Sequence, residues 1–184
     1  DVDASGNLLI APTSVRREMI VRAPGTDMDV NLSWLDWSTP QILSSDGRLV
    51  VFQEGMVSTD DGYAIYLRET SGGPPLLLDY GQVMALSPEA RWIAVVKRQF
   101  GENPELLLVP TGPGQPRTLD TGNLRLRHSS DAWVAGSSPS DPGSLLFVAL
   151  ERDGALRLYH LPLTDDATPR AVTPPDFGLA PLGH

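Results

Sequence analysis

The sequence predicts an all-β repeat protein built from four-stranded antiparallel units. Two turn-and-strand patterns recur along the chain at one common spacing, and 17 glycines and 17 prolines interrupt the apolar runs of its 184 residues. Those runs, such as Leu49–Phe52 and Ile93–Val96, have the length and the β-branched composition of strands. Helical repeats would instead need periodic apolar stripes of about ten or more residues.

The first pattern is a tight turn followed by a buried strand. It begins at Ser44, Ser87 and, in a stretched form, Ser138, at intervals of 43 and 51 residues. Pro presets the first position of such a turn, Asp or Ser caps it through the side chain, and Gly accepts a positive φ. Ala90 replaces the glycine in the second copy, which leaves a different turn type open there.

The second pattern is a strand, a Gly/Pro-rich loop and another strand. Its loops end at Pro75, Pro116 and Pro169, at intervals of 41 and 53 residues. Two independent patterns therefore give one period, which lengthens in the same unit. We place the extra residues of that unit in 123–130 and in the Ser/Pro-rich turn at 137–144.

Each unit thus offers four strands. We predict them at 39–44, 48–54, 63–70 and 75–79, at 82–86, 91–98, 104–110 and 116–120, and at 131–136, 144–151, 155–161 and 169–173. A four-stranded unit of about 40–45 residues is typical of β-propeller blades. The prediction is a β-propeller of four-stranded antiparallel blades, with whole blades at 39–81, 82–122 and 123–174.

The two ends of the chain predict partial blades. Residues 1–38 contain strand-like segments at 7–10, 18–22 and 30–35, which resemble the outer strands of a blade, and residues 175–184 resemble the start of a further one. Three whole and two partial blades favour a fragment of a six-to-eight-bladed propeller. Alternatively, the last strand completes the first blade and closes a small ring. Because the chain begins at Asp1 without Met or a signal region, we expect a processed product or a part of a longer protein.

The composition of the chain limits the kinds of partner that it can bind. The net charge is −9 and the pI is about 4.6, so nucleic-acid binding is disfavoured because an acidic surface repels phosphates. No apolar run approaches the length of a membrane span. Cysteine is absent, which excludes disulfides and identifies no compartment; we favour an extracytoplasmic, periplasmic location over a cytoplasmic one.

The chain carries no motif for catalysis, cofactor binding or metal binding. It lacks a phosphate-binding loop, kinase signatures and a nucleophile elbow. His128, Ser129 and Asp131 could be grouped as a triad, but three neighbours in sequence rarely have triad geometry, and we expect a solvated loop there. The histidines are too scattered for zinc. The acidic pairs Asp60-Asp61 and Asp165-Asp166 are expected to be solvated turn residues, because the spacing of a calcium loop is missing.

Trp34 and Trp37, which flank Asp36, are the candidate binding residues. Tryptophan is enriched in binding hot spots, so these three residues could form an aromatic surface for a partner near a blade junction. The structural alternative, which we favour, is that both rings wedge between adjacent blades with their indole N–H groups hydrogen-bonded.

The segment around these tryptophans resembles a known family. Residues 31–38, Asn-Leu-Ser-Trp-Leu-Asp-Trp-Ser, are similar to an element of bacterial TolB-like β-propellers, and the runs 43–48, 66–74, 85–88, 107–114 and 169–174 are similar to its following blades. The resemblance implies a WD-repeat-like propeller of the kind found as the C-terminal sensor or interaction part of bacterial serine/threonine kinases and related regulators. Ala90 and the split turn at 137–144 depart from the family pattern.

We therefore predict a non-catalytic binding or sensing module. Its loops would present a protein, a peptide or a small, cell-wall-derived ligand with a rigid surface at one end of the propeller channel. Open blade edges could also pair with another chain. The alternative is the regulatory propeller of a bacterial serine/threonine kinase whose catalytic domain lies outside this chain.

Overall fold

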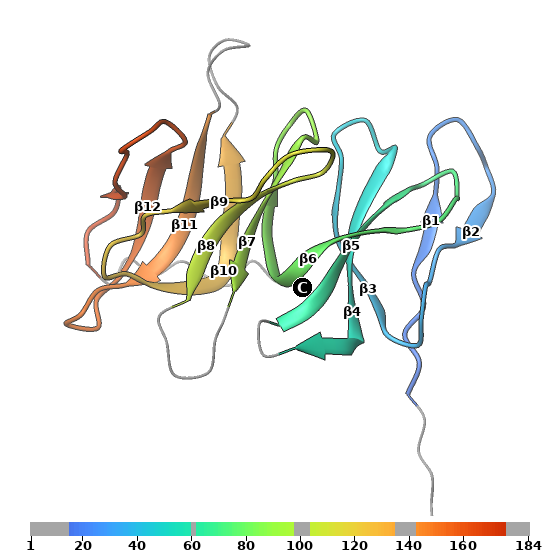
Figure 1. Ribbon diagram of the computed structural model, residues 1–184, viewed down its shortest axis with the longest axis horizontal. Coiled ribbons are helices and arrows are strands. Elements are labelled where there is room, and N and C mark those ends of the chain that lie inside the picture. Colours follow the sequence, from blue (N-terminus) through green and yellow to red (C-terminus); the bar gives the residue numbers. More distant parts are fainter. Residues whose placement is uncertain (1–14, 60–61, 98–103, 135–142, 176–184) are drawn as a thin grey trace, which may run out of the picture.

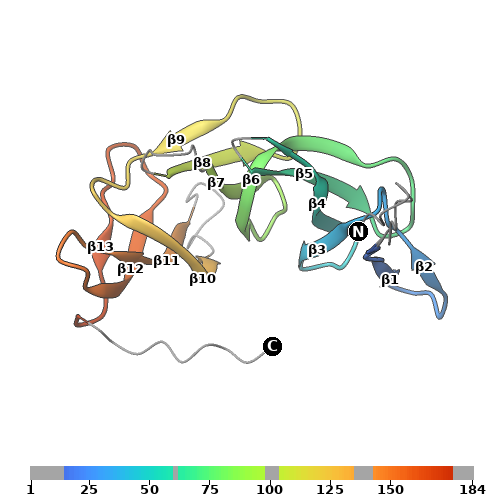
Figure 2. The ribbon, with the colours of Figure 1, turned by 90° about the horizontal axis from the view of Figure 1, so that it is seen from below.

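The computed structural model describes residues 15–59, 62–97, 104–134 and 143–175. Every regular element in these ranges is a β-strand, which confirms the predicted all-β class. The same residues contain no helix that could cross a membrane. The strands form three antiparallel sheets, which lie next to one another along an open arc (Figures 1 and 2).

The central sheet has seven strands in chain order and consists of two meanders that share a strand. We call β3–β6 the first meander and β6–β9 the second. The strands are β3 (Ser38–Leu43), β4 (Leu49–Thr59), β5 (Gly62–Glu69), β6 (Leu76–Leu86), β7 (Trp92–Lys97), β8 (Glu105–Pro110) and β9 (Arg117–Leu119). Figure 2 shows β3 near the inner side of the arc and β9 on its outer side.

The shared strand β6 corrects the prediction of two separate strands at 75–79 and 82–86. Its first part pairs with β5 as far as Gly81, and from Gln82 onward it pairs with β7. Gly81 has a φ of 143°, and a Cβ built there would lie 2.6 Å from Val95 Cγ1. Only glycine fits at this crossover, so the chain passes between the meanders without a turn.

The third meander is a separate four-stranded sheet. It contains β10 (Arg125–Val134), β11 (Ser144–Leu150), β12 (Leu156–Pro162) and β13 (Arg170–Ala171). We predicted its first strand at 131–136 and an insertion at 123–130; instead, residues 125–130 belong to the strand. A register shift between Arg127 and Ala132 accommodates extra residues within the β10–β11 pairing. The stretched turn predicted at 137–144 lies largely outside the described residues.

A two-stranded sheet precedes the central one. It contains β1 (Ile20–Arg22) and β2 (Asp29–Asn31). Both strands are shorter than the predicted 18–22 and 30–35, although the Leu32 N–H still donates to the Met19 carbonyl at 2.8 Å. The segment predicted at 7–10 lies outside the described residues, as does the predicted start of a further blade at 175–184 apart from Pro175.

Buried side chains join neighbouring sheets and meanders. On β4, Val50 and Phe52 pack with Met19 and Leu32, which flank the two-stranded sheet, whereas Val51 packs on the other face against the second meander. Strands β7 and β8 alternate in the same way, with one face packed toward the first meander and the other toward the third. Because successive side chains point to opposite faces, a strand buried on both faces reads as a continuous apolar run. This explains the unbroken runs in the sequence.

The turn that begins at Ser44 and the turn that begins at Ser87 are the same structure. Gly47 and Ala90 have φ values of 71° and 55°, and each donates its N–H to the serine carbonyl at 2.8 Å. A threonine hydroxyl then closes each turn, donating to the Gly47 carbonyl at 2.7 Å or the Ala90 carbonyl at 2.6 Å. Ala90 therefore keeps the left-handed conformation of the glycine, and the turn does not change type.

Candidate functional site

The segment from Trp34 to Ser38 is attached to the central sheet by a buried carboxylate. Ser38 and Glu54 are paired residues of β3 and β4, with exposed fractions of 1% and 0%. The Ser38 hydroxyl donates to Glu54 Oε1, which also accepts the Leu35 N–H at 3.1 Å. Ser38 Oγ in turn accepts the Trp34 N–H at 2.8 Å. The segment is thus fixed where β3 begins.

The three predicted binding residues do not all line one pocket. Trp34 is 49% exposed. Asp36 is exposed; its backbone carbonyl accepts the Arg17 N–H at 2.9 Å. Trp37 is half-buried and lines a pocket. Of the three residues, only Trp37 belongs to that pocket.

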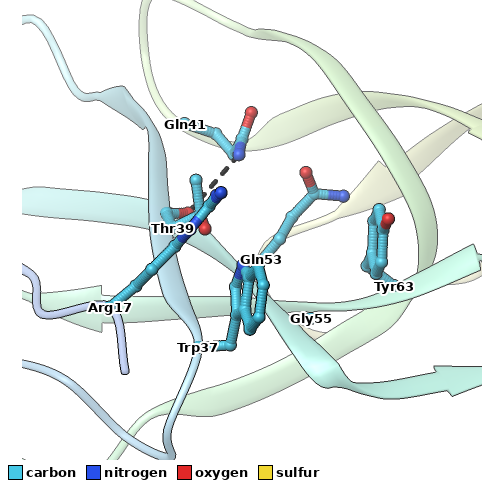
Figure 3. A pocket seen from close by; sticks show the side chains of 7 residues that line it. All are labelled: Arg17, Trp37, Thr39, Gln41, Gln53, Gly55 and Tyr63. Atoms are coloured by element: carbon cyan, nitrogen blue, oxygen red, sulfur yellow. Dashed lines mark hydrogen bonds between the residues drawn. The ribbon is translucent and has the colours of Figure 1, made fainter. Parts of the chain in front are cut away.

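The pocket encloses about 370 Å³ next to the Trp37 ring. Its lining comes from the segment before β1 and from three paired strands, and Figure 3 shows the side chains around the indole. We call it the Trp37 pocket; its residues are Arg17, Trp37, Thr39, Gln41, Gln53, Gly55 and Tyr63.

The strand pleat explains which residues reach the pocket. Gln53 and Gly55 are two apart on β4 and so face the same side of that strand, and Thr39 is the partner of Gln53 on β3. Gln41 lies at the register shift between Pro40 and Ile42, where β3 carries one extra residue. A Cβ on Gly55 would lie 2.8 Å from Trp37 Cδ1. The absence of a side chain at Gly55 is what lets the indole lie against β4.

Arg17 supplies the charge of the pocket. Its guanidinium carbon lies 4.5 Å from the centroid of the Trp37 ring, a cation–π contact. A parallel bridge between Arg17 and Trp37 fixes its backbone. Among the described residues, no carboxylate lies within ion-pair distance of Arg17, and none of the lining residues is acidic.

Two glutamines complete the polar lining. Gln53 is 8% exposed and donates from Nε2 to the Gly81 carbonyl at 2.7 Å, which ties the pocket to the crossover in β6. Gln41 donates to the Thr39 carbonyl at 3.4 Å (Figure 3). The arrangement can offer hydrogen bonds and one positive charge to a ligand beside an aromatic surface.

Two hollows in the second and third meanders are larger, at about 510 and 470 Å³, but a charged side chain that lines each of them already has a partner within the protein. In the first, Arg117 contacts Asp165 at 3.3 Å and donates to the Leu163 carbonyl at 3.0 Å. In the second, the Tyr159 hydroxyl donates to Glu151 at 2.6 Å. Burial and this hydrogen bond raise the pKa of Tyr159 to about 12. The Trp37 pocket is therefore the better candidate site.

The remaining predicted positions lie elsewhere. Residues 128–131 belong to β10, so the expectation of a solvated loop there was wrong. Asp165 and Asp166 lie in a turn as predicted, with Asp166 at a φ of 57°; Asp60-Asp61 lies outside the described residues. In the described part of the chain, no group of three or more His, Asp or Glu side chains is placed to hold a metal.

Sequence reasoning missed most of the pocket. Arg17, Gln41, Gln53 and Tyr63 come from four separate segments and carry no shared motif. The available signal was Gln53, a polar residue that directly follows the buried run Leu49–Phe52.

The chain is similar in structure to TolB from Acinetobacter baumannii. The TM-score is 0.61 at 15% sequence identity, and the match covers 88% of this chain and 39% of that one. No family model and no curated protein matches the sequence. The structural likeness shows a TolB-like fold, and the chain spans well under half the length of the TolB chain.

Proposed function

We propose that this chain is a non-catalytic binding module, a portion of a β-propeller that receives a protein or peptide at the Trp37 pocket. The observation that carries the proposal is a guanidinium that has no ion-pair partner among the described residues and lies over an indole in a pocket framed by strands. The TolB-like fold supports the scaffold part of the proposal, since it places loops and strand ends on a stiff frame.

The pocket is built on rigid elements. Three of its sides come from β3, β4 and β5, which are hydrogen-bonded to one another over their length. A site on paired strands loses little conformational entropy when a ligand binds, because its side chains are already placed. This favours recognition of an extended peptide by preformed contacts.

The arrangement of the three meanders in a propeller is also part of the proposal. We infer that the three meanders are blades, and that further blades or a second copy of the chain would complete the ring. Among the described strands, β3 is an edge of the central sheet, and it lies toward the inside of the arc (Figure 2). The molecular mass in solution tests this point: a dimer supports pairing of open edges, and a monomer supports self-closure.

A peptide-display selection against the whole chain tests the binding function. The control protein is the Gln41→Trp variant, whose larger side chain fills the mouth of the pocket. Gln41 is half-buried on β3, and its side chain makes one long hydrogen bond within the described residues. We expect selected peptides to bind the original chain and to lose binding to the variant. Equal binding to both proteins would contradict the Trp37 pocket as the binding site. Failure to select any peptide would contradict peptide binding altogether.

A further inference from the structure

We propose that the Trp37 pocket recognises a carboxylate on a peptide ligand, with Arg17 as the residue that binds it and an apolar side chain of the ligand resting against Trp37 and Tyr63. This rests on the proposed peptide-binding function and specifies the chemical class of the ligand.

The charge of the pocket is opposite to that of the protein. The chain carries a net charge of −9, yet the lining contains one arginine and no acid. Neighbouring Arg16, in contrast, lies 3.7 Å from Glu18 and 4.0 Å from Asp36. Arg17 is therefore a cation without a described counter-ion, fixed at a hollow where an anionic group could supply one.

Within the described part of the chain, Arg17 makes a cation–π contact and no ion pair, so the edge of its guanidinium can still donate hydrogen bonds. Its guanidinium contacts the face of the Trp37 ring, and a stacked guanidinium keeps its N–H groups in its own plane. That planar fork matches the two oxygens of a carboxylate. Thr39, Gln41 and Gln53 add polar groups beside it that can bond to the ligand backbone (Figure 3).

A carboxylate suits this pocket better than a phosphate. A phosphoryl group carries a charge of about −1.5 to −2 at neutral pH, which one guanidinium does not balance inside an acidic protein. One carboxylate matches one guanidinium, and the rings of Trp37 and Tyr63 offer an apolar surface directly beside it. The ligand we expect has a carboxylate next to an apolar side chain, as at the C-terminus of a peptide.

The test is an NMR titration of the whole chain with N-acetyl-glycyl-phenylalanine and with its C-terminal amide. We expect the acid to shift the Trp37 indole resonance and the amide to bind at least about tenfold more weakly, because the charged hydrogen bonds are lost. A third probe, N-acetyl-glycyl-glutamyl-phenylalanine amide, distinguishes a side-chain carboxylate from a chain terminus: binding of this amide assigns the source to the side chain. Tighter binding of inorganic phosphate than of the acid would overturn the proposal.

Two matched variants localise the effect. Arg17→Ala should weaken binding of the acid by at least about tenfold and leave the amide unchanged, whereas Arg16→Ala removes the same charge one residue away and should change neither by more than about twofold. Equal losses in both variants would indicate general electrostatic attraction and contradict the proposal. If display-selected peptides need an open pocket but bind equally as acid and amide, the carboxylate inference fails while the proposed function stands.

Discussion

Substituting Ser38→Ala tests whether the buried Ser38–Glu54 pair holds the segment that carries both candidate tryptophans. The serine hydroxyl donates to Glu54 Oε1, and its oxygen accepts the Trp34 N–H at 2.8 Å. The second oxygen, Glu54 Oε2, is buried without a hydrogen-bond partner among the described residues. After the substitution, the Leu35 N–H, at 3.1 Å, is the remaining described donor to this carboxylate.

The expected loss follows from these contacts. A hydrogen bond to a charged group contributes about 1.5–3 kcal/mol, and a neutral one about 0.5–1.5 kcal/mol. Trp34 is half exposed, so water can replace the acceptor of its N–H, and the second contribution falls at the lower end of its range. We expect the free energy of unfolding to fall by about 2–4 kcal/mol. For a chain of this size, that lowers Tm by roughly 5–12 °C.

Urea denaturation followed by tryptophan fluorescence measures this loss, with Ser71→Ala as the control. Ser71 is exposed, and its hydroxyl contacts Glu69 at 3.2 Å, so its substitution should cost less than about 0.5 kcal/mol. Glu54→Gln should cost less than Ser38→Ala, because an amide oxygen still accepts both bonds and no charge remains buried. The reasoning fails if Ser38→Ala matches the Ser71 control, or if Glu54→Gln destabilises the chain as much as Ser38→Ala does.

Three further substitutions follow from the structure. Gly55→Ala should push the Trp37 ring out of place and cost about 1–3 kcal/mol in thermal denaturation, whereas Gly112→Ala, with no heavy atom within 4 Å of the added Cβ, should cost far less; similar losses would contradict the packing argument. Ala90→Gly should raise the stability by up to about 1 kcal/mol, because the position has a φ of 55°, and a clear destabilisation in urea would refute that. Burial and the Glu151 hydrogen bond raise the folded pKa of Tyr159 to about 12, against about 10 when unfolded; the unfolded state releases its proton first, so stability is retained below pH 10 and falls between pH 10 and 12. Tyr159→Phe should flatten that fall, and an unchanged alkaline slope in the variant would count against the assignment.

Local sequence patterns were sufficient to predict the strands. The Ser44 and Ser87 turns combine a capping serine, a residue with a positive φ and a following apolar strand, and each interaction spans only a few residues. The strand predictions were wrong where the structure depends on residues that are distant in the sequence. The chain crosses from the first meander to the second at Gly81, and whether a turn or a continuous strand forms there depends on how closely Val95 approaches.

The Trp37 pocket, in contrast, depended on the tertiary structure. The sequence determined an all-β chain with a repeated turn and strands buried on both faces, because turn chemistry and side-chain alternation are properties of neighbouring residues. The tertiary structure decided that Arg17 lies over Trp37 and that Gln53 faces the same hollow, because strand register and the bridge beside β3 bring distant residues together. It also made Trp37, and not Trp34, part of the pocket, while the hydrogen bonds of Ser38 and Glu54 fix the segment that carries both residues.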